Sequence, residues 1–576
     1  MVKGKARNRD LIGFLIALAI LIMINVIGSY LYLRLDLTSE DRYSLSAPTK
    51  ALLQNLDDQV YITVYLEGNF PASFKRLRNE SREMLSEFAN TAEGELEFDF
   101  INPSESPDMK ERDRVYRNLY DIGLRPTDLE IKDEDGISKK IVWPGAVIRY
   151  RDKEVAVQLL KSQFGAPPEV VLNQSIESLE YELAAAIKRI TKPVKKKIAF
   201  IEGHGELNKF ETADAMRALR EVHEVERLAL KGDIRALASR SMISDSAARV
   251  VNKFDLIIIA DPDSAFDEKD KFIIDQYIMY GGKVIWMIDP VNASMDSLRN
   301  KNTMLAVPRD LNLGDQLFSY GVRFNQDLVQ DLRSAPIPIV SGQYGTQVKT
   351  QLYPWLFYPL LISKNNHPIN KNIEVVRAQF ASSLDLVGND ELKKTVVLST
   401  SDKSKIVRAP TRVSLNMLSY EPPVDQFKKQ DLPIAVLVEG KFKSIYAHRL
   451  TPQMYESGEI NYRHESKEGM QLFIADGDLI KNRYNPKTNE YYVMGMDRYT
   501  QQMYGNKDFF LNAVNYMLDE SGLILSNTKS FKIRLLDREF IAQNRLMLQL
   551  LNTAVPIALV LIFGLVFGFI RKRKYS

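Results

Sequence analysis

Residues Leu546–Ile570 read LMLQLLNTAVPIALVLIFGLVFGFI and contain no charged residue, and four basic residues, Arg571–Lys574, follow directly. About 20 apolar residues in a helix span a bilayer core, so this stretch is long enough to cross a membrane. Pro556 does not exclude such a helix, because neighbouring groups, water or local adjustments satisfy the carbonyl that it frees. Lys and Arg are in excess on the cytoplasmic side of membranes, so we expect this end of the chain in the cytoplasm.

A second uncharged stretch, Leu11–Leu33, lies near the other end and is preceded by Lys3, Lys5, Arg7 and Arg9. Its apolar run exceeds the 7–15 residues of a signal peptide, and tyrosines and an arginine follow it where small cleavage-site residues would be expected. We interpret it as an uncleaved anchor. Two spans with basic flanks predict a two-pass protein of the cell inner membrane, with both termini cytoplasmic and the bulk of the chain periplasmic.

The composition of the chain is that of folded protein, with 45% apolar and 26% charged residues. The roughly 500 residues between the two spans predict about three domains. The net charge of +3 indicates no special partner. The chain has no cysteine, which excludes disulfides, thiolate metal sites and a cysteine nucleophile.

The N-terminal part of this region shows an alternation of strands and helices. Val60–Leu66 alternates as a strand does, helical spacing follows through Phe74–Phe88, and Leu96–Phe100 alternates again. This is a βαβ pattern, and it resembles a thioredoxin-like arrangement, although the absence of cysteine excludes dithiol chemistry. Further short strands are expected up to residue 158, and a helix over Gln174–Ile190.

The central part predicts a doubly wound parallel sheet. Strands are expected at Ile198–Ile201, Phe254–Ala260 and Lys283–Ile288, with a helix that starts at Asp267. From about Asn292 the pattern loosens into a β-rich insertion. The parallel pattern is expected to resume with further strands and a helix, listed here in chain order: Ile434–Val438, Gln471–Ala475 and Asp508–Leu518.

The ligand-prone edge of such a sheet is formed by the carboxyl ends of its strands, where Glu202, His204, Asp261 and Asp289 are expected. These four are the candidate ligand-binding residues. Each has an ordinary structural alternative: Gly203 and Gly205 would only form a tight turn around His204, and acidic residues at strand ends often cap helices or hold turns. No catalytic residue is assigned.

The sequence gives little support for nucleotide binding or metal binding. The Gly203-His204-Gly205 turn has Asn208 where a dinucleotide fingerprint needs a third glycine, and the sequence contains no phosphate loop for ATP hydrolysis. None of the five histidines stands four residues from another, so no metal site and no cofactor is expected. Basic and acidic residues alternate on the helix face of residues 75–87, which is typical of a solvated surface and not of nucleic acid binding.

The order of several segments carries a family resemblance. These are DLTSEDRYSLSAPTK (Asp36–Lys50), the strand and helix of Val60–Phe88, KKKIAFIEGHGE (Lys195–Glu206), RAQFASSLD (Arg377–Asp385) and QLFIADGDLIKNRY (Gln471–Tyr484). The chain resembles the gliding-motility-associated GldG family of Bacteroidota. The resemblance implies an auxiliary subunit of an ABC transporter that works with a separate permease, GldF, and a separate ATPase, GldA. It also implies a central domain similar to glutamine-amidotransferase-like (flavodoxin-like) folds, without amidotransferase activity, because their nucleophile is a cysteine.

The sequence patterns and the family resemblance together predict an α/β protein that is divided into the following domains and segments. Its parts are a basic tail (1–10), a first transmembrane helix (11–33), a thioredoxin-like domain (34–192), the first part of the amidotransferase-like domain (193–291), a β-rich insertion (292–432), the second part of that domain (433–529), a membrane-proximal connector (530–545), a second transmembrane helix (546–570) and a basic tail (571–576).

Two functions remain open at this point. The first is a non-enzymatic transporter subunit that binds a periplasmic substrate or partner, with Gly564 and Gly568 in a G-x-x-x-G spacing as helix-packing residues. The second is a periplasmic envelope hydrolase or ligand-processing enzyme that uses Glu202, His204 and Asp261. The absence of a convergent nucleophile and base favours the first, and whether those three side chains meet in one pocket discriminates between them.

Overall fold

The computed structural model describes residues 13, 15–16, 18–23, 44–133, 136–161, 168–191, 195–244, 247–344, 347–365, 367–371, 373–388, 391–488, 490–524 and 538–575. The chain divides into two compact units, Met1–Lys529 and Ser530–Ser576. Most of the predicted first transmembrane helix and residues 530–537 of the predicted connector lie outside the described residues.

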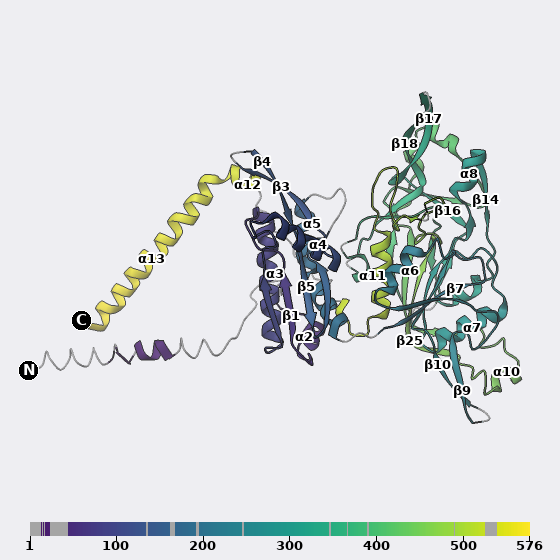
Figure 1. Cartoon of the computed structure of the whole chain (residues 1–576), viewed down its shortest axis with the longest axis horizontal. Helices are drawn as coiled ribbons and strands as arrows, with labels where there is room; N and C mark the ends of the chain where they lie inside the picture. The colour runs from purple at the N-terminus through teal and green to yellow at the C-terminus, as the bar shows by residue number, and fades with distance from the viewer. Residues whose placement is uncertain are drawn as a thin grey trace, which may run out of the picture. The chain divides into compact units, whose positions relative to one another are not determined.

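The N-terminal part of the first unit contains a four-stranded sheet in the order β2-β1-β5-β6 (Figure 1). Its strands are β1 (Val60–Val64), β2 (Leu96–Phe100), β5 (Gly145–Tyr150) and β6 (Lys153–Gln158). β2 runs parallel to β1, whereas β5 is antiparallel to both β1 and β6. The predicted βαβ unit is therefore confirmed.

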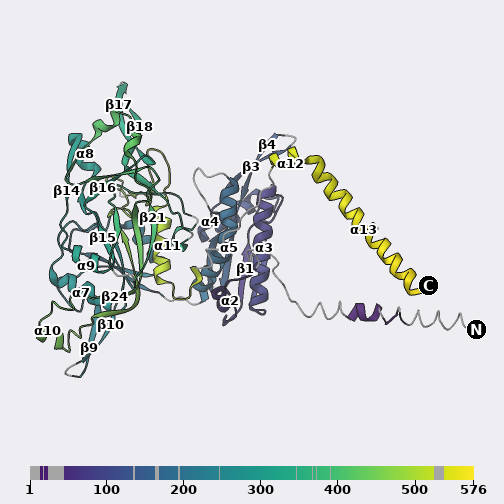
Figure 2. The same cartoon turned by 180° about the vertical axis from the view of Figure 1, so that it is seen from behind.

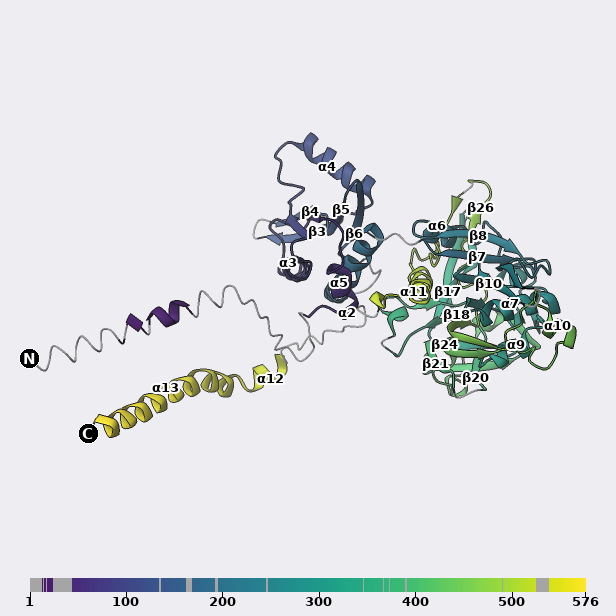
Figure 3. The same ribbon diagram turned by 90° about the horizontal axis from the view of Figure 1, so that it is seen from below.

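Helices α3 (Ala72–Thr91) and α5 (Pro168–Thr191) lie together on one side of this sheet, and α4 (Met109–Ile122) lies on the other (Figure 3). The first two bury apolar stripes, as their sequence spacing predicts. The sequence analysis missed α4, because Leu119 is its one buried residue and most of its surface is charged. Its ends are nonetheless marked by an Asp108 N-cap and by Gly123 at a φ of +115°.

The central sheet has seven strands in the order β21-β24-β25-β12-β11-β7-β8. Their bounds are β7 (Lys197–Glu202), β8 (Glu224–Ala229), β11 (Leu256–Ala260), β12 (Lys283–Met287), β21 (Lys393–Ser399), β24 (Pro433–Lys443) and β25 (Glu465–Ile474). The five strands from β8 to β25 are parallel.

The other two strands differ from the expected parallel sheet. β24 pairs antiparallel with β25, and β21 pairs antiparallel with β24. The connection from β24 to β25 contains only the short helix α10 (Pro452–Glu456) and no longer helix of the kind that usually forms a parallel crossover. β21 lies within residues 292–432, the range predicted as an insertion, but it is a strand of the central sheet. The predicted insertion therefore includes one strand of that sheet.

Helices cover both faces of the central sheet. α6 (Ala213–Arg220) and α11 (Asn506–Leu518) pack on one face, and α7 (Glu268–Met279) and α9 (Gly314–Ser319) pack on the other (Figure 2). Successive β7 residues alternate between the two cores: Ile198 and Phe200 face one, and Ala199 and Ile201 face the other. Burial on both faces explains the near-continuous apolar runs in the sequence.

A β-rich region with its own apolar core follows β12. Its largest elements are β14 (Thr303–Pro308), β16 (Asp327–Asp331), β17 (Ser334–Tyr344), β18 (Gln347–Leu361), β22 (Ser404–Arg408) and β23 (Thr411–Ser414). All of these pair antiparallel, and β17 and β18 form a long hairpin that extends away from the central sheet (Figure 1).

The remaining elements of the first unit are short. They are α2 (Ala47–Leu53), β3 (Thr127–Asp133), β4 (Gly136–Val142), β9 (Ala238–Ser244), β10 (Ala247–Asn252), β13 (Val291–Asn292), α8 (Met295–Lys301), β15 (Val322–Phe324), η1 (Pro368–Asn370), β19 (Val376–Arg377), β20 (Leu384–Leu386), η2 (Leu415–Ser419), η3 (Val424–Gln426), β26 (Tyr484–Asn485) and β27 (Glu490–Tyr491).

The second unit consists of α12 (Arg538–Gln543) and the long helix α13 (Arg545–Tyr575). Pro556 lies within α13, as the sequence analysis allows. Within the part of the chain that the structure describes, one helix is long and apolar enough to cross a membrane, over Arg545–Ile570. The second predicted span is therefore a helix of the required length, while a two-pass topology stays a prediction.

Candidate functional site

Four neighbouring parallel strands of the central sheet end at one edge. Glu202 is the last residue of β7, Asp261 follows β11, and Asp289 follows β12 after one residue. β25 is followed by Ala475-Asp476-Gly477-Asp478. The carboxyl ends of parallel strands are where open α/β sheets bind ligands, so this edge is the candidate site.

Asp261 and Asp289 lie on either side of Gly477. The Gly477 backbone N–H donates to Asp289 Oδ1 at 2.7 Å, and a Cβ on Gly477 would lie 2.8 Å from Asp261 Oδ1. Glycine is therefore required for the loop after β25 to pass this close to Asp261. Asp261 itself has a φ of +50°, a strained value for a residue with a Cβ.

Two further carboxyl groups complete an acidic cluster of Asp261, Asp289, Asp476 and Asp478. Asp476 is fully buried, and its Oδ2 accepts the Gln379 backbone N–H at 2.9 Å. The Gln379 side chain donates to Asp478 Oδ1 at 3.3 Å. Asp476 Oδ1 has no hydrogen-bond partner among the described residues.

Cations offset part of this charge. Arg309 Nη1 donates to Asp261 Oδ1 at 2.7 Å and to the Pro262 carbonyl at 2.8 Å. Lys481 forms an ion pair of 3.1 Å with Glu211, and its charge also favours ionised Asp478. Arg377 also favours ionised Asp478, so three cations act on the four acidic groups.

Burial raises the pKa of every carboxyl in the acidic cluster. For Asp261 burial outweighs the opposing effect of Arg309, and the pKa rises to about 6. Burial and the neighbouring carboxylates place the pKa values of Asp289 and Asp476 well above their ordinary value. Burial also raises the pKa of Asp478, against the effect of Lys481. Burial therefore disfavours the ionised form of each carboxyl in the acidic cluster.

His204 is not part of this cluster. Its Nδ1 lies 3.1 Å from Glu206 Oε1, its Nε2 lies 3.1 Å from Asp270 Oδ2, and its ring stacks on Phe266 with centroids 3.7 Å apart. Burial disfavours the charged ring, but the two carboxylates outweigh burial and raise the pKa of His204. The side chain is buried, and both of its ring nitrogens contact carboxylates.

Glu202 also lies outside the acidic cluster. It pairs with Arg227 of β8, whose guanidinium also donates to the Leu207 carbonyl and to Thr212 Oγ1 at 2.7 Å. Of the four predicted residues, the structure thus brings Asp261 and Asp289 together and directs Glu202 and His204 to other partners. The three residues of the enzyme hypothesis do not form a common hydrogen-bonded site.

Sequence reasoning missed Asp476 and Asp478 as site residues, and also Arg309. The repeated pattern of acidic residues directly after an apolar strand, at residues 261, 289 and 476, was the available signal for the two carboxylates. Arg309 gives no such signal, because it reaches Asp261 from a loop after β14.

The cluster offers little for catalysis. None of its carboxyl groups is hydrogen-bonded to a hydroxyl or imidazole of a described residue, so no nucleophile and base pair is formed. Within the described ranges, no group of three or more His, Asp or Glu side chains is arranged to hold a metal ion. The hydrogen bonds of the arrangement fix the loops at the sheet edge.

Comparison with known proteins identifies a family for more than half of the chain. A family model described as "ABC-type uncharacterized transport system" matches residues 195–513, and a model for a domain of unknown function (DUF7088) matches residues 39–149. The chain is 22% identical over 580 residues to an uncharacterized protein of Borreliella burgdorferi, with 99% of each chain covered. A solved structure titled "mmIFT52 N-terminal domain" matches with a TM-score of 0.31 and 12% identity, covering 56% of this chain and 98% of that one.

Proposed function

We propose that this chain, which belongs to the family described as an ABC-type uncharacterized transport system, is a non-catalytic, membrane-anchored auxiliary subunit of an ABC transporter. The observation that carries the proposal is the family match over residues 195–513, which includes all seven strands of the central sheet. An ABC transport system contains a permease and an ATPase. Because this sequence has no phosphate loop, the ATPase would be a separate chain, and the resemblance in the sequence implies a separate permease.

The state of the candidate site supports a binding or structural role. His204 contacts carboxylates through both ring nitrogens, Glu202 pairs with Arg227, and the acidic cluster is closed over by Arg309 and the Gly477 loop. An enzyme at this edge would need an accessible nucleophile next to a base. The envelope-hydrolase alternative therefore has no specific observation in its favour.

The finer parts of the proposal rest on the resemblance in the sequence. We place the chain with the gliding-motility GldG proteins, with GldF as permease and GldA as ATPase. We also propose a two-pass topology in the inner membrane, with residues 34–545 in the periplasm. In this scheme residues 34–192 form a thioredoxin-like domain, supported by the strand order β2-β1-β5-β6, and residues 193–529 contain an amidotransferase-like domain.

Affinity purification from native membranes tests the subunit assignment. A tag on the full chain should recover an integral membrane permease and a P-loop ATPase in constant proportion after mild crosslinking. A variant that ends before Arg545 lacks α13 and serves as the control, since it should lose the permease while its first unit stays folded. Recovery of the full chain alone, under conditions that preserve a known membrane complex, would contradict the proposal.

A further inference from the structure

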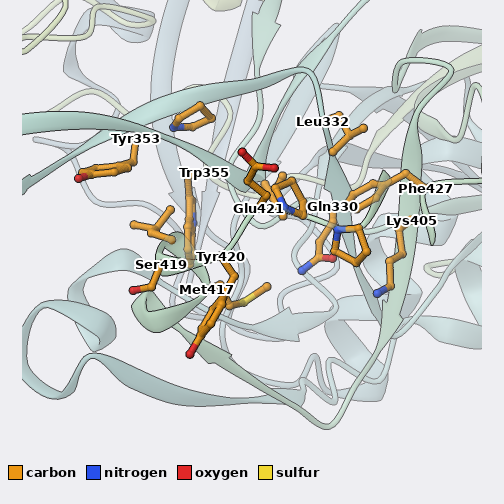
Figure 4. Close-up of a pocket in the computed structure, with 15 residues that line it drawn as sticks. Gln330, Leu332, Tyr353, Trp355, Lys405, Met417, Ser419, Tyr420, Glu421 and Phe427 are labelled. Atoms are coloured by element: carbon orange, nitrogen blue, oxygen red, sulfur yellow. The ribbon is translucent and has the colours of Figure 1, made fainter. Parts of the chain in front are cut away.

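The β-rich region contains a pocket with a volume of about 550 Å³, within the range of small-ligand pockets. One wall is formed by the paired strands β16 and β22, and the others by residues 353–356 of β18 and by the loop of residues 417–427 (Figure 4). Most of the lining side chains are leucine, methionine, proline, tyrosine, tryptophan or phenylalanine. The lining therefore favours a ligand whose larger part is apolar.

Two polar side chains lie next to each other in this apolar lining. Gln330 of β16 and Lys405 of β22 are paired across the two strands, and Figure 4 shows them at the same end of the pocket. Lys405 Nζ donates to the neutral Gln426 Oε1 at 2.7 Å, and among the described residues Lys405 forms no ion pair. One end of the pocket thus carries a cation without an acidic partner.

Further lysines surround this end of the pocket. Lys428 directly follows the lining residue Phe427, and the Lys429 backbone pairs with that of Ser404, the neighbour of Lys405. Neither Lys428 nor Lys429 forms an ion pair within the part of the chain that the structure describes. Their charges add to that of Lys405.

Acidic residues offset only part of this charge. Asp402 and Asp425 are exposed in residues 402–405 and 425–429, two segments that together hold four lysines. Glu421 lines the pocket, but it is exposed on the loop, and Figure 4 shows its carboxyl group turned away from Lys405. The Lys405 end of the pocket therefore attracts an anion.

We propose that this pocket binds the acyl chain of an anionic amphiphile, such as a fatty acid or an anionic phospholipid, with the head group at Lys405. The apolar walls around Leu332, Trp355 and Phe427 bury the methylene groups of the chain. Lys405 donates a charge-assisted hydrogen bond to a carboxylate or phosphate oxygen, and the Gln330 amide supplies a second donor. Amphiphiles of this kind are available to a chain whose helix α13 is long and apolar enough to cross a membrane.

Other ligand classes fit the pocket less well. A neutral apolar ligand would leave Lys405 without a counter-charge, and a sugar would leave the apolar walls without contacts. None of these observations depends on the transporter assignment, so the two proposals can fail separately.

The test uses the full chain in phosphatidylcholine nanodiscs and a photoreactive diazirine analogue of palmitic acid, which reports where it binds even beside a bilayer. Mass spectrometry should find label in residues 353–356 or 417–427 in addition to α13. Excess palmitic acid should abolish the pocket label. Hexadecanol has the same chain without the charge and should compete at least about tenfold more weakly, since hydrogen bonds to charged groups are the stronger ones.

Phosphatidylglycerol added to the nanodisc distinguishes the two sources of the ligand. If it reduces the pocket label, the head group and chain come from a bilayer phospholipid. If it leaves the pocket label unchanged while palmitic acid removes it, the ligand is a free fatty acid. Either result supports an anionic amphiphile.

Variants separate the head-group contact from folding. Lys405→Met should reduce the pocket label about tenfold and leave the α13 label and Tm unchanged. Lys403→Met, the same change at an exposed position outside the pocket, should alter none of these. If Lys405→Met lowers Tm, the comparison of palmitic acid with hexadecanol in the unchanged chain decides instead. Label confined to α13, equal competition by hexadecanol, or a full pocket label in a folded Lys405→Met chain would each overturn the proposal.

Discussion

His204 Nε2 and Asp270 Oδ2 lie 3.1 Å apart, and the contact joins the turn after β7 to the first turn of α7. On the other side of the ring, Glu206 accepts from both the His204 backbone N–H, at 2.7 Å, and the imidazole. The Gly203-His204-Gly205 turn is therefore held by the histidine side chain as well as by its glycines. We therefore expect His204 to contribute to the stability of this turn.

His204→Ala should consequently reduce the free energy of unfolding by about 3 kcal/mol, because it leaves two buried carboxylates without their cation. Urea denaturation at pH 6 measures the change. His448→Ala, at an exposed position, is the control and should be neutral. The pKa of His204 is raised in the folded state, so its contribution is complete below pH 6.5 and is lost as the pH rises through the raised pKa. A wild-type stability of the same size at pH 6 and pH 9 would argue against this ion pair.

Gly205→Ala should destabilise the protein by about 2 kcal/mol for two separable reasons. Gly205 has a φ of +77°, and a Cβ there would lie 1.7 Å from Asp263 Oδ1. Asp263 is exposed and able to rotate, so the steric part should disappear in an Asp263→Ala background while the backbone strain of about 1 kcal/mol remains. A double-mutant cycle with no coupling between the two positions would show that the close approach is unimportant.

Asp476→Asn should stabilise the protein at high pH. Burial and the neighbouring carboxylates raise the pKa of Asp476 well above its usual value, so its contribution to stability is complete below about pH 4 and lost as the pH rises through the raised pKa. Asparagine stays neutral, keeps the acceptor for the Gln379 N–H, and supplies a donor toward Asp478. We expect a gain of about 1 kcal/mol at pH 8 and almost none at pH 4.

The control for this comparison is Asp402→Asn at an exposed position, which should leave the pH profile of Tm unchanged. A lower Tm of Asp476→Asn at pH 8 would show that the ionised form of Asp476 stabilises the fold, against the raised pKa.

Gly564 and Gly568 are predicted to contact the permease within the bilayer. A Cβ at either position would meet nothing within 4 Å in the isolated chain, so replacement does not disturb α13 itself. Small residues at this spacing let helix backbones approach closely. Gly564→Leu with Gly568→Leu should release the permease in detergent while Tm of the first unit is unchanged. Leu561→Ala with Leu565→Ala is a matched pair of substitutions at the same spacing, and survival of the complex in both pairs would place the contact elsewhere.

The proposed topology predicts two short protected fragments. Protease added to spheroplasts should digest the described first unit and spare segments near both ends of the chain, because the basic clusters flank both spans on the same side. Immunodetection of tags at the two ends measures the fragments, with a cytoplasmic marker as the control for intact cells. Digestion of a tag after Ser576 from the outside would contradict the prediction.

Elements with strong local patterns were predicted correctly from the sequence. The strands β1, β7, β11 and β12 and the helices α3, α5 and α11 lie where alternation or helical spacing indicates them. The N-terminus of α7 is marked by Asp267, whose side chain accepts from the Asp270 N–H at 2.7 Å. α4 was not predicted, because a helix with one buried residue shows almost no periodic spacing of apolar residues.

The direction of pairing could not be predicted in the same way. The sequences of β24 and β21 are those of ordinary apolar strands, and their antiparallel placement depends on partners that are far apart in sequence.

By itself, the sequence determined the apolar C-terminal helix, the buried parallel strands and the absence of cysteine and phosphate-loop chemistry, since these depend on local composition and spacing. The tertiary structure alone decided which carboxylates meet. Asp261 and Asp289 lie beside Asp476 and Asp478 because β11, β12 and β25 are neighbours in the sheet, although β25 comes almost 180 residues after β12. It also decided that His204 is buried between Glu206 and Asp270, because the energy of a buried ionisable group depends on long-range partners that no local pattern specifies.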